Sequence, residues 1–198
     1  MMPKMNGIQL CERLKNDERT SHIPLILLTA KSASEDKIEG LETGADDYIM
    51  KPFDAEVLKV RIKNLIEQIR KLREHFKKEG LIELEDKEIT SIDKKFLQNA
   101  VEIINKHLSD TSFNVEMFAE EVSMSRRNLE RKLASLTGDS PADLIRRLRL
   151  IYASKLLTQK FGNISEIALE VGFSNPAYFS KCFREQYGLT PSEYETSM

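Results

Sequence analysis

Hydrophobic and polar positions change their periodicity along the chain, and the first 78 residues mix two periods. Residues 7–16 place apolar side chains at helical spacing, whereas "IPLILLTA" at 23–30 is a continuous apolar run typical of a buried parallel strand. The pattern predicts a further helix over 34–45, a short strand in "DDYIMKPF" at 46–53 and a long helix over 54–78. This order of elements predicts part of a doubly wound α/β domain.

The pattern breaks at residues 79–92, which are charged and show little periodicity, and we interpret them as a linker between domains. From residue 93 onward the periodicity is helical. The first of these helices carries one apolar stripe, made of Phe96, Leu97, Ala100, Ile103, Ile104 and Leu108. We therefore expect a mainly α protein in which an incomplete α/β part at 1–78 precedes a helical domain at 93–198.

Two segments of the helical part repeat one plan. They are "NVEMFAEEVSMSRRNLERKLASLTGDSP" and "NISEIALEVGFSNPAYFSKCFREQYGLTP". Each contains a short helix, a tight turn and a second helix, and each closes with Gly and Pro, which is the helix-turn-helix arrangement. Two copies about 50 residues apart, joined by a predicted helix over 140–158, are more specific than one helical hairpin.

The second helix of each unit has an apolar face that must pack inward and a polar face that points outward. Arg127 and Arg131 lie on the outward face in the first unit, and Lys181 lies there in the second. Arg and Lys can donate hydrogen bonds to guanine edges or to phosphates. Taken singly, each is more readily explained as a solvated charge. Their occurrence in a duplicated unit favours a DNA-binding surface.

The stretch "ISEIALEVGFSNPAYFSKCFREQYGLTPSEY" closely resembles the signature of AraC-type transcription regulators, and the resemblance covers residues 93–198. It implies a seven-helix domain whose two recognition helices enter successive major grooves of double-stranded DNA. By motif position it implies base contacts from Arg127, Glu130, Arg131, Ala177, Tyr178 and Lys181. The expected phosphate contacts are Ser125, Arg146, Asn175, Ser180 and Arg184.

The segments "MMPKMNG", "LLTA" and "DYIMKPF" together resemble the second half of a response-regulator receiver domain. The resemblance implies accessory roles for Thr29, whose hydroxyl would sense a phosphoryl group, and for Lys51, whose cation would pair with it. It also implies a cis Lys51–Pro52 bond and an acceptor aspartate upstream of Met1, so this chain would contain no phosphoacceptor. We therefore expect Met1 to be a cut, and residues 1–53 to be unable to form a monomeric receiver.

The helix predicted at 54–78 could join two copies of the chain. Its apolar residues recur at spacings of four and three, as in a coiled-coil seam, at Leu58, Ile62, Leu65, Ile69, Leu72 and Phe76. The simpler interpretation is that the first of these residues cover the receiver sheet. We expect a homodimer formed through this helix.

Composition narrows the function further. The net charge is −2, but residues 79–121 carry 4 basic and 11 acidic side chains, whereas residues 122–198 carry 11 basic and 8 acidic ones. The two cysteines are far apart and the three histidines do not cluster, so we expect no metal and no cofactor. No apolar run reaches membrane-spanning length. We expect a cytoplasmic chain without membrane contact, small-molecule substrate or catalytic residues.

Three functions fit these patterns. The first is a sequence-specific DNA-binding transcription regulator that forms the output part of a two-component phosphorelay, either free-standing or as the tail of a hybrid sensor. The second is a phosphotransfer receiver module of a hybrid sensor kinase without DNA binding, which Thr29 and Lys51 favour and the missing aspartate opposes. The third is a protein-interaction module, supported only by the acidic segment at 79–121.

Overall fold

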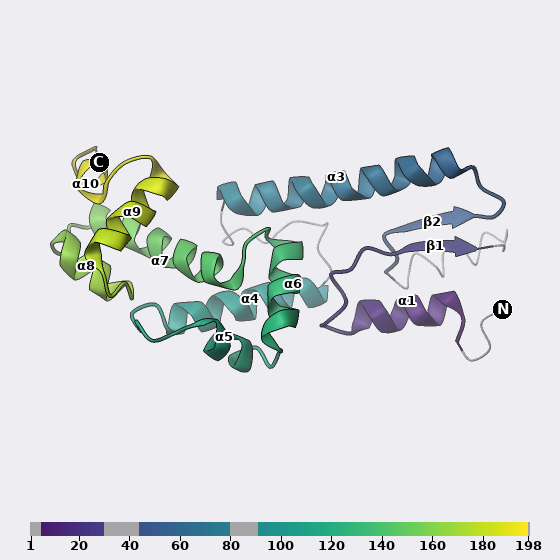
Figure 1. The fold of residues 1–198 in the computed structure, drawn as a ribbon, viewed down its shortest axis with the longest axis horizontal. Helices are drawn as coiled ribbons and strands as arrows, with labels where there is room; N and C mark the ends of the chain where they lie inside the picture. Colours follow the sequence, from purple (N-terminus) through teal and green to yellow (C-terminus); the bar gives the residue numbers. More distant parts are fainter. Residues whose placement is uncertain (1–4, 30–43, 80–90, 198) are drawn as a thin grey trace. The chain divides into compact units, whose positions relative to one another are not determined.

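The computed structural model describes residues 5–29, 44–79 and 91–197, which form two compact units (Figure 1). The first unit comprises Met1–Gln98 with Arg131–Gly138, and the second comprises Asn99–Glu130 with Asp139–Met198. The helix predicted at 34–45 lies outside the described residues.

The first unit begins with the elements that the sequence predicts for a receiver fragment. They are helix α1 (Gly7–Asn16), strands β1 (Ile26–Thr29) and β2 (Asp47–Met50), and helix α3 (Ala55–Glu79). The side chain of Asn6 caps α1 in a capping box with Gln9. The two strands pair in parallel, with Ile26 opposite Asp47 and Thr29 opposite Met50. The helix, strand, strand and long helix expected here are therefore confirmed.

This receiver part has a small core. Among the described residues up to 79, the buried apolar side chains are Cys11, Ala45 and Ile49. The strand residues Leu28 and Met50 stay 43% and 51% exposed. Apolar strand side chains that lack covering neighbours contribute little of the stabilisation that burial gives. The described residues 5–29 and 44–79 therefore bury few apolar side chains.

Helix α3 has 25 residues and is about 37 Å long at 1.5 Å per residue. Leu58, Leu65 and Ile69 are half-buried, whereas Ile62 is 42% and Ile66 61% exposed. The other two seam positions, Leu72 and Phe76, lie outside the described side chains. The coiled-coil seam stays a prediction.

Residues 91–197 form the seven helices that the sequence predicts. They are α4 (Ser91–Lys106), α5 (Val115–Glu121), α6 (Arg126–Leu136), α7 (Pro141–Thr158), α8 (Ile164–Glu170), α9 (Pro176–Tyr187) and α10 (Pro191–Ser197). The apolar stripe predicted on α4 is buried from Phe96 to Ile104, and Leu108 is half-buried beyond the end of the helix. The mainly α fold class is confirmed.

Helix α7 organises the core of the second unit. Ser140 caps it, and Pro141 occupies its first turn, where a missing backbone N–H is harmless. Its buried residues from Leu150 to Leu157 pack with a cluster from α8 and α9 that includes Phe179. Figure 1 shows α8, α9 and α10 gathered around the C-terminal end of α7. This packing holds the second helix-turn-helix unit on α7.

Candidate nucleic-acid interface

The turns of the two helix-turn-helix units share a positive-φ residue and one backbone hydrogen bond, and the second turn is one residue longer. Ser123 and Gly172 both take positive φ, at 56° and 76°. The next residue in each turn donates its N–H back to the preceding helix, from Met124 to Ala119 at 2.9 Å and from Phe173 to Ala168 at 2.8 Å. The repeat read from the sequence is therefore a structural repeat.

The second turn tolerates no side chain. A Cβ on Gly172 would lie 2.3 Å from the backbone oxygen of Leu108 and 2.7 Å from Cζ of Arg149. Arg149 is buried in α7 and donates from Nη1 to the carbonyl of Gly172 at 2.9 Å. Burial lowers the pKa of this guanidinium, and the carboxylate of Asp110 partly opposes the change. Arg149 thus ties the second turn to α7.

The predicted phosphate contacts Ser125 and Asn175 lie at the starts of the two recognition helices. The side chain of Asn175 caps α9 by accepting from the backbone N–H of Ala177 at 2.9 Å and of Tyr178 at 3.1 Å. The hydroxyl of Ser125 accepts from the N–H of Asn128 at 3.3 Å. Both side chains therefore fix helix geometry, whatever they contact outside the chain.

In α6 the apolar residues Leu129, Leu133 and Leu136 are buried, while Arg127 and Arg131 are exposed. This is the division of faces that the helical period predicts.

Glu130 is less available than its exposed neighbours. It is half-buried, and its carboxylate accepts from Nε of Arg126 at 2.9 Å. Arg126 also bonds Glu116, and its pKa is raised, chiefly by the hydrogen bond to Glu130. Sequence reasoning did not single out Arg126, although the four-residue spacing from Arg126 to Glu130 was a usable signal.

In α9 the inner face consists of buried Phe179 and Phe183 with half-buried Tyr187. The outward face exposes the predicted base and phosphate contacts Ala177, Tyr178, Lys181 and Arg184. Lys181 lies 3.9 Å from Glu185, and both side chains are more than 60% exposed, so this ion pair holds the lysine weakly. The hydroxyl of Ser180 is half-buried and donates to the carbonyl of Pro176 at 3.0 Å.

A cavity of about 390 Å³ within the second unit adjoins the starts of both recognition helices. Arg126, Arg146, Asn175 and Tyr178 are among its lining residues. Nη1 of Arg146 lies 3.5 Å from the hydroxyl of Tyr178, and the same guanidinium pairs with Asp143. The structure thus brings Arg146 of α7 to Tyr178 of α9.

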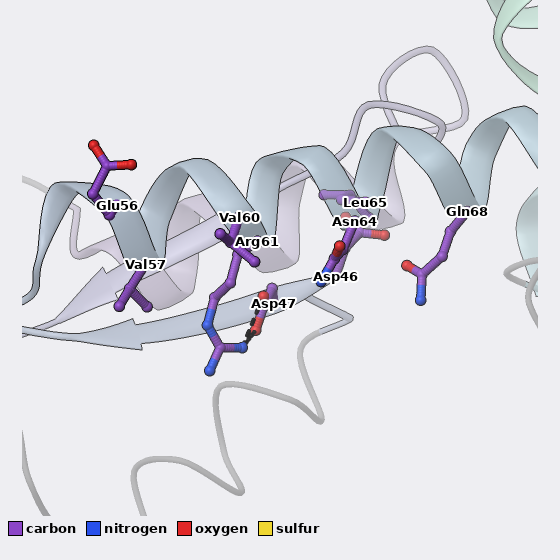
Figure 2. A pocket seen from close by; sticks show the side chains of 9 residues that line it. All are labelled: Asp46, Asp47, Glu56, Val57, Val60, Arg61, Asn64, Leu65 and Gln68. Carbon is purple, nitrogen blue, oxygen red and sulfur yellow. Dashed lines mark hydrogen bonds and ion pairs between the residues drawn. The ribbon is translucent and has the colours of Figure 1, made fainter.

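The two receiver accessory positions lie next to each other at the ends of the parallel strands. The backbone N–H of Lys51 donates to the carbonyl of Thr29 at 2.6 Å, and the Lys51–Pro52 bond is cis, as expected. A separate cavity of about 660 Å³ lies beside α3 and the start of β2, where Arg61 pairs with Asp47 at 2.8 Å (Figure 2). Neither Thr29 nor Lys51 lines that cavity.

Two negative findings apply to residues 5–29, 44–79 and 91–197. No group of three or more His, Cys, Asp or Glu side chains is arranged to hold a metal ion. None of the helices in these ranges combines the length and the apolar character that crossing a membrane requires.

Comparison with known protein families matches the two ends of the chain to two different families. The profile of the family described as "Response regulator receiver domain" matches residues 1–63, and that described as "Helix-turn-helix domain" matches residues 118–197. A solved transcriptional regulator with an AraC-type DNA-binding domain from Chromobacterium violaceum is 30% identical, with a TM-score of 0.50. The match covers 55% of this chain and 96% of that one.

Two curated relatives match different extents of the chain. Histidine kinase P4 of Formosa agariphila is 40% identical over 195 residues, which is 98% of this chain and 14% of that protein. The phosphate regulon transcriptional regulatory protein PhoB of Pseudomonas aeruginosa is 53% identical over 66 residues, 33% of this chain and 29% of that protein. The chain thus spans a small part of the length of these relatives. It joins part of a response-regulator receiver domain to a helix-turn-helix domain of the AraC type.

Proposed function

We propose that this chain binds double-stranded DNA sequence-specifically and forms the output part of a two-component phosphorelay. The observation that carries the proposal is the structural repeat, in which both helix-turn-helix units share a positive-φ turn residue and one turn hydrogen bond and expose a cation at the matched positions Arg131 and Lys181. Two recognition helices on one domain can enter successive major grooves. Such a role places the chain in the cytoplasm.

The exposed residues of α6 and α9 support one set of contacts for specificity and another for orientation, and both sets include half-buried residues, namely Glu130, Arg146 and Ser180. We assign base contacts to Arg127, Glu130 and Arg131 of α6 and to Ala177, Tyr178 and Lys181 of α9. Phosphate contacts fall to Ser125, Arg146, Asn175, Ser180 and Arg184. Contacts to phosphates fix the register on the duplex, whereas contacts to base edges carry the sequence information.

The relative named as a histidine kinase supports a hybrid parent for this chain. Its match covers both the receiver part and the helical domain, in the same order. In such an arrangement Thr29 and Lys51 would respond to a phosphoryl group on an aspartate outside this chain. The alternative, a phosphotransfer module without DNA binding, does not explain why two exposed cationic helix faces are repeated.

Selection from a random duplex library followed by substitution tests the proposal. The intact chain should enrich a defined site, and its affinity should fall steeply as salt rises, because phosphate binding releases counterions. Arg131→Ala and Lys181→Ala should each weaken binding to the selected site by about 1–3 kcal/mol and relax the preference at separate base positions. Lys155→Ala, at an exposed position on α7 outside the proposed interface, serves as the control.

The same experiment separates the alternatives. If no duplex is enriched and weak binding is insensitive to salt, the interaction-module interpretation replaces ours. If the two substitutions weaken binding equally on every sequence, Arg131 and Lys181 contact phosphates and the base-contact assignment is wrong.

We also propose that the chain forms a homodimer through α3. Its support is the set of exposed apolar side chains on this helix, Val57, Val60, Ile62 and Ile66. Multi-angle light scattering should give twice the chain mass, and Ile66→Glu, at the most exposed of these positions, should shift the mass toward the monomer. A strict monomer at high concentration would exclude the dimer.

A further inference from the structure

A lysine of the first recognition helix is completely buried. Lys132 is 0% exposed, and its Nζ lies 2.9 Å from Oδ1 of Asp93, which is itself 2% exposed. The same ammonium donates to the hydroxyl of Ser21 at 3.0 Å and to the backbone carbonyl of Glu18. It also lies 4.6 Å from the ring centre of Phe96. All these residues belong to the first compact unit.

Buried charges of this kind are not needed to build the helix-turn-helix. When the two units are aligned on their buried faces, Leu133 matches Phe183, and Lys132 therefore matches Cys182. Cys182 is also buried, at 3% exposure, but it sits in an apolar cluster. The second helix-turn-helix unit thus has a small apolar residue at this position. Only the first helix-turn-helix unit has a buried lysine at this position.

The partners of this lysine include residues of the receiver part of the chain. Ser21 and Glu18 belong to the segment of residues 17–23 that follows α1, and the Ser21 hydroxyl also donates to Asp93 at 2.7 Å. A second contact joins the same segment to α6, because the hydroxyl of Ser135 donates to the carbonyl of His22 at 3.4 Å. The segment therefore meets the inner side of α6 at two successive turns.

Lys15, the second-last residue of α1, connects this segment to the strands. Lys15, only 6% exposed, pairs with Asp46 at 2.6 Å and donates to the carbonyl of Ser21 at 3.3 Å. The carboxylate of Asp46 accepts from the backbone N–H of Leu25 at 2.7 Å, directly before β1. Continuous polar contacts therefore run from the strands to α6.

We propose that Lys132, Asp93 and Ser21, here called the Lys132 cluster, position the first recognition helix against the receiver part, so that DNA reading by α6 depends on the receiver and reading by α9 does not. This inference rests on the proposed DNA-binding function and deepens it. Lys132, Asp93 and Ser21 are positioning residues, because none of them is exposed enough to touch DNA.

Two physical features favour positioning. Removing one partner of a buried ion pair is strongly destabilising, so the Lys132–Asp93 pair favours one position of α6 relative to Asp93. The reading face stays open when the cluster is formed, since Arg127 and Arg131 are exposed. Docking of residues 17–23 therefore supports reading by α6 without covering it, and loss of docking should weaken the first half-site.

The test uses the full chain and the selected duplex, with either half-site scrambled. Lys132→Met keeps an unbranched side chain, one atom shorter, and removes the charge. It should weaken binding to the intact site about tenfold, and this loss should vanish on a duplex whose α6 half-site is already scrambled. Scrambling the α9 half-site should leave the tenfold ratio unchanged. Lys132→Arg, which retains a charge, should restore part of the affinity.

A second substitution and a matched control keep the result interpretable. Ser21→Ala leaves the Lys132–Asp93 pair in place, together with the bonds from α6 to the carbonyls of Glu18 and His22, and removes only the hydroxyl that joins both charges to the receiver part. It should therefore show a half-site bias of the same direction, but smaller, even if Lys132→Met fails to fold. Arg147→Met breaks a different, largely buried ion pair, to Asp139 at 2.7 Å, and should lower stability without half-site bias.

The outcomes separate the two proposals. If the unmodified chain binds no duplex, the proposed function fails and the inference fails with it. If the unmodified chain binds but Lys132→Met and Ser21→Ala bind like it, or lose affinity equally at both half-sites, the Lys132 cluster is only structural and the inference is overturned.

Discussion

The two helix-turn-helix units share a backbone plan but are stabilised by different means. The second unit is closed by aromatic contacts, with ring centres 5.3 Å apart for Phe173 and Phe179 and 4.6 Å apart for Phe183 and Tyr187. The first unit has an aliphatic face on α6 and places a buried lysine where the second has Cys182. Apolar burial is non-directional, whereas a buried charge is strongly destabilised when one of its partners is removed.

This difference suggests why a regulator would carry two unequal reading units. The second helix-turn-helix unit packs against α7 through its own aromatic residues, and its recognition helix α9 takes part in that apolar cluster. The first recognition helix takes part of its support from residues 17–23 of the receiver part. Under the proposed function, the receiver part can adjust the first recognition helix while the second keeps its own contacts with DNA.

The largest expected effect distinguishes the two turns. Gly172→Ala should destabilise the chain by at least about 2 kcal/mol, because the new Cβ meets backbone and Arg149 atoms at a positive φ. Ser123→Gly should change stability by less than about 1 kcal/mol, since Ser123 already tolerates φ of 56° with a side chain. Urea unfolding followed by circular dichroism measures both. Equal losses would show that the turns are not built differently.

A smaller effect distinguishes the two recognition-helix starts. Asn175→Ala removes two hydrogen bonds to the first turn of α9 and should cost about 1 kcal/mol. Ser125→Ala removes one long bond and should cost about 0.5 kcal/mol. Chemical denaturation provides the comparison, with the substitutions made separately. A larger loss of stability for Ser125→Ala than for Asn175→Ala would contradict the view that the N-cap of α9 is the stronger one.

The smallest effect concerns pH and falls on the first compact unit, which contains His22. Burial, reinforced by the charge of Lys132, lowers the pKa of His22. Protonation is then easier in the unfolded chain, so stability should decline as pH falls below the ordinary histidine pKa of about 6.5. His22→Gln should flatten this part of the pH profile, measured by urea unfolding between pH 7.5 and 5.5. An unchanged slope would show that His22 does not titrate with unfolding.

Periodicity predicted most of the fold because it reports local burial. In α4, α6 and α9 the apolar residues that the helical period places on one face are buried. The capping residue Asn175 and the turn residues Ser123 and Gly172 were readable for the same reason, since each acts on its own neighbours in sequence.

Contacts between distant segments could not be read in this way. Nothing in the local pattern indicates that Lys132 pairs with Asp93 or that Ser21 lies 111 positions from its partner. From the helical period alone a lysine beside Leu133 is assigned to solvent. The aligned position of Cys182 was the one available signal, since a buried residue there in the second unit predicts a buried residue in the first.

The most direct test of DNA reading by both helices is a footprint of the intact chain on its selected duplex, with guanine N7 methylation as the major-groove probe. The account predicts two protected major-groove segments about one helical turn, roughly 10 base pairs, apart on one face of the DNA, one lost in Arg131→Ala and the other in Lys181→Ala. A single protected segment, or two that respond identically to both substitutions, would contradict it.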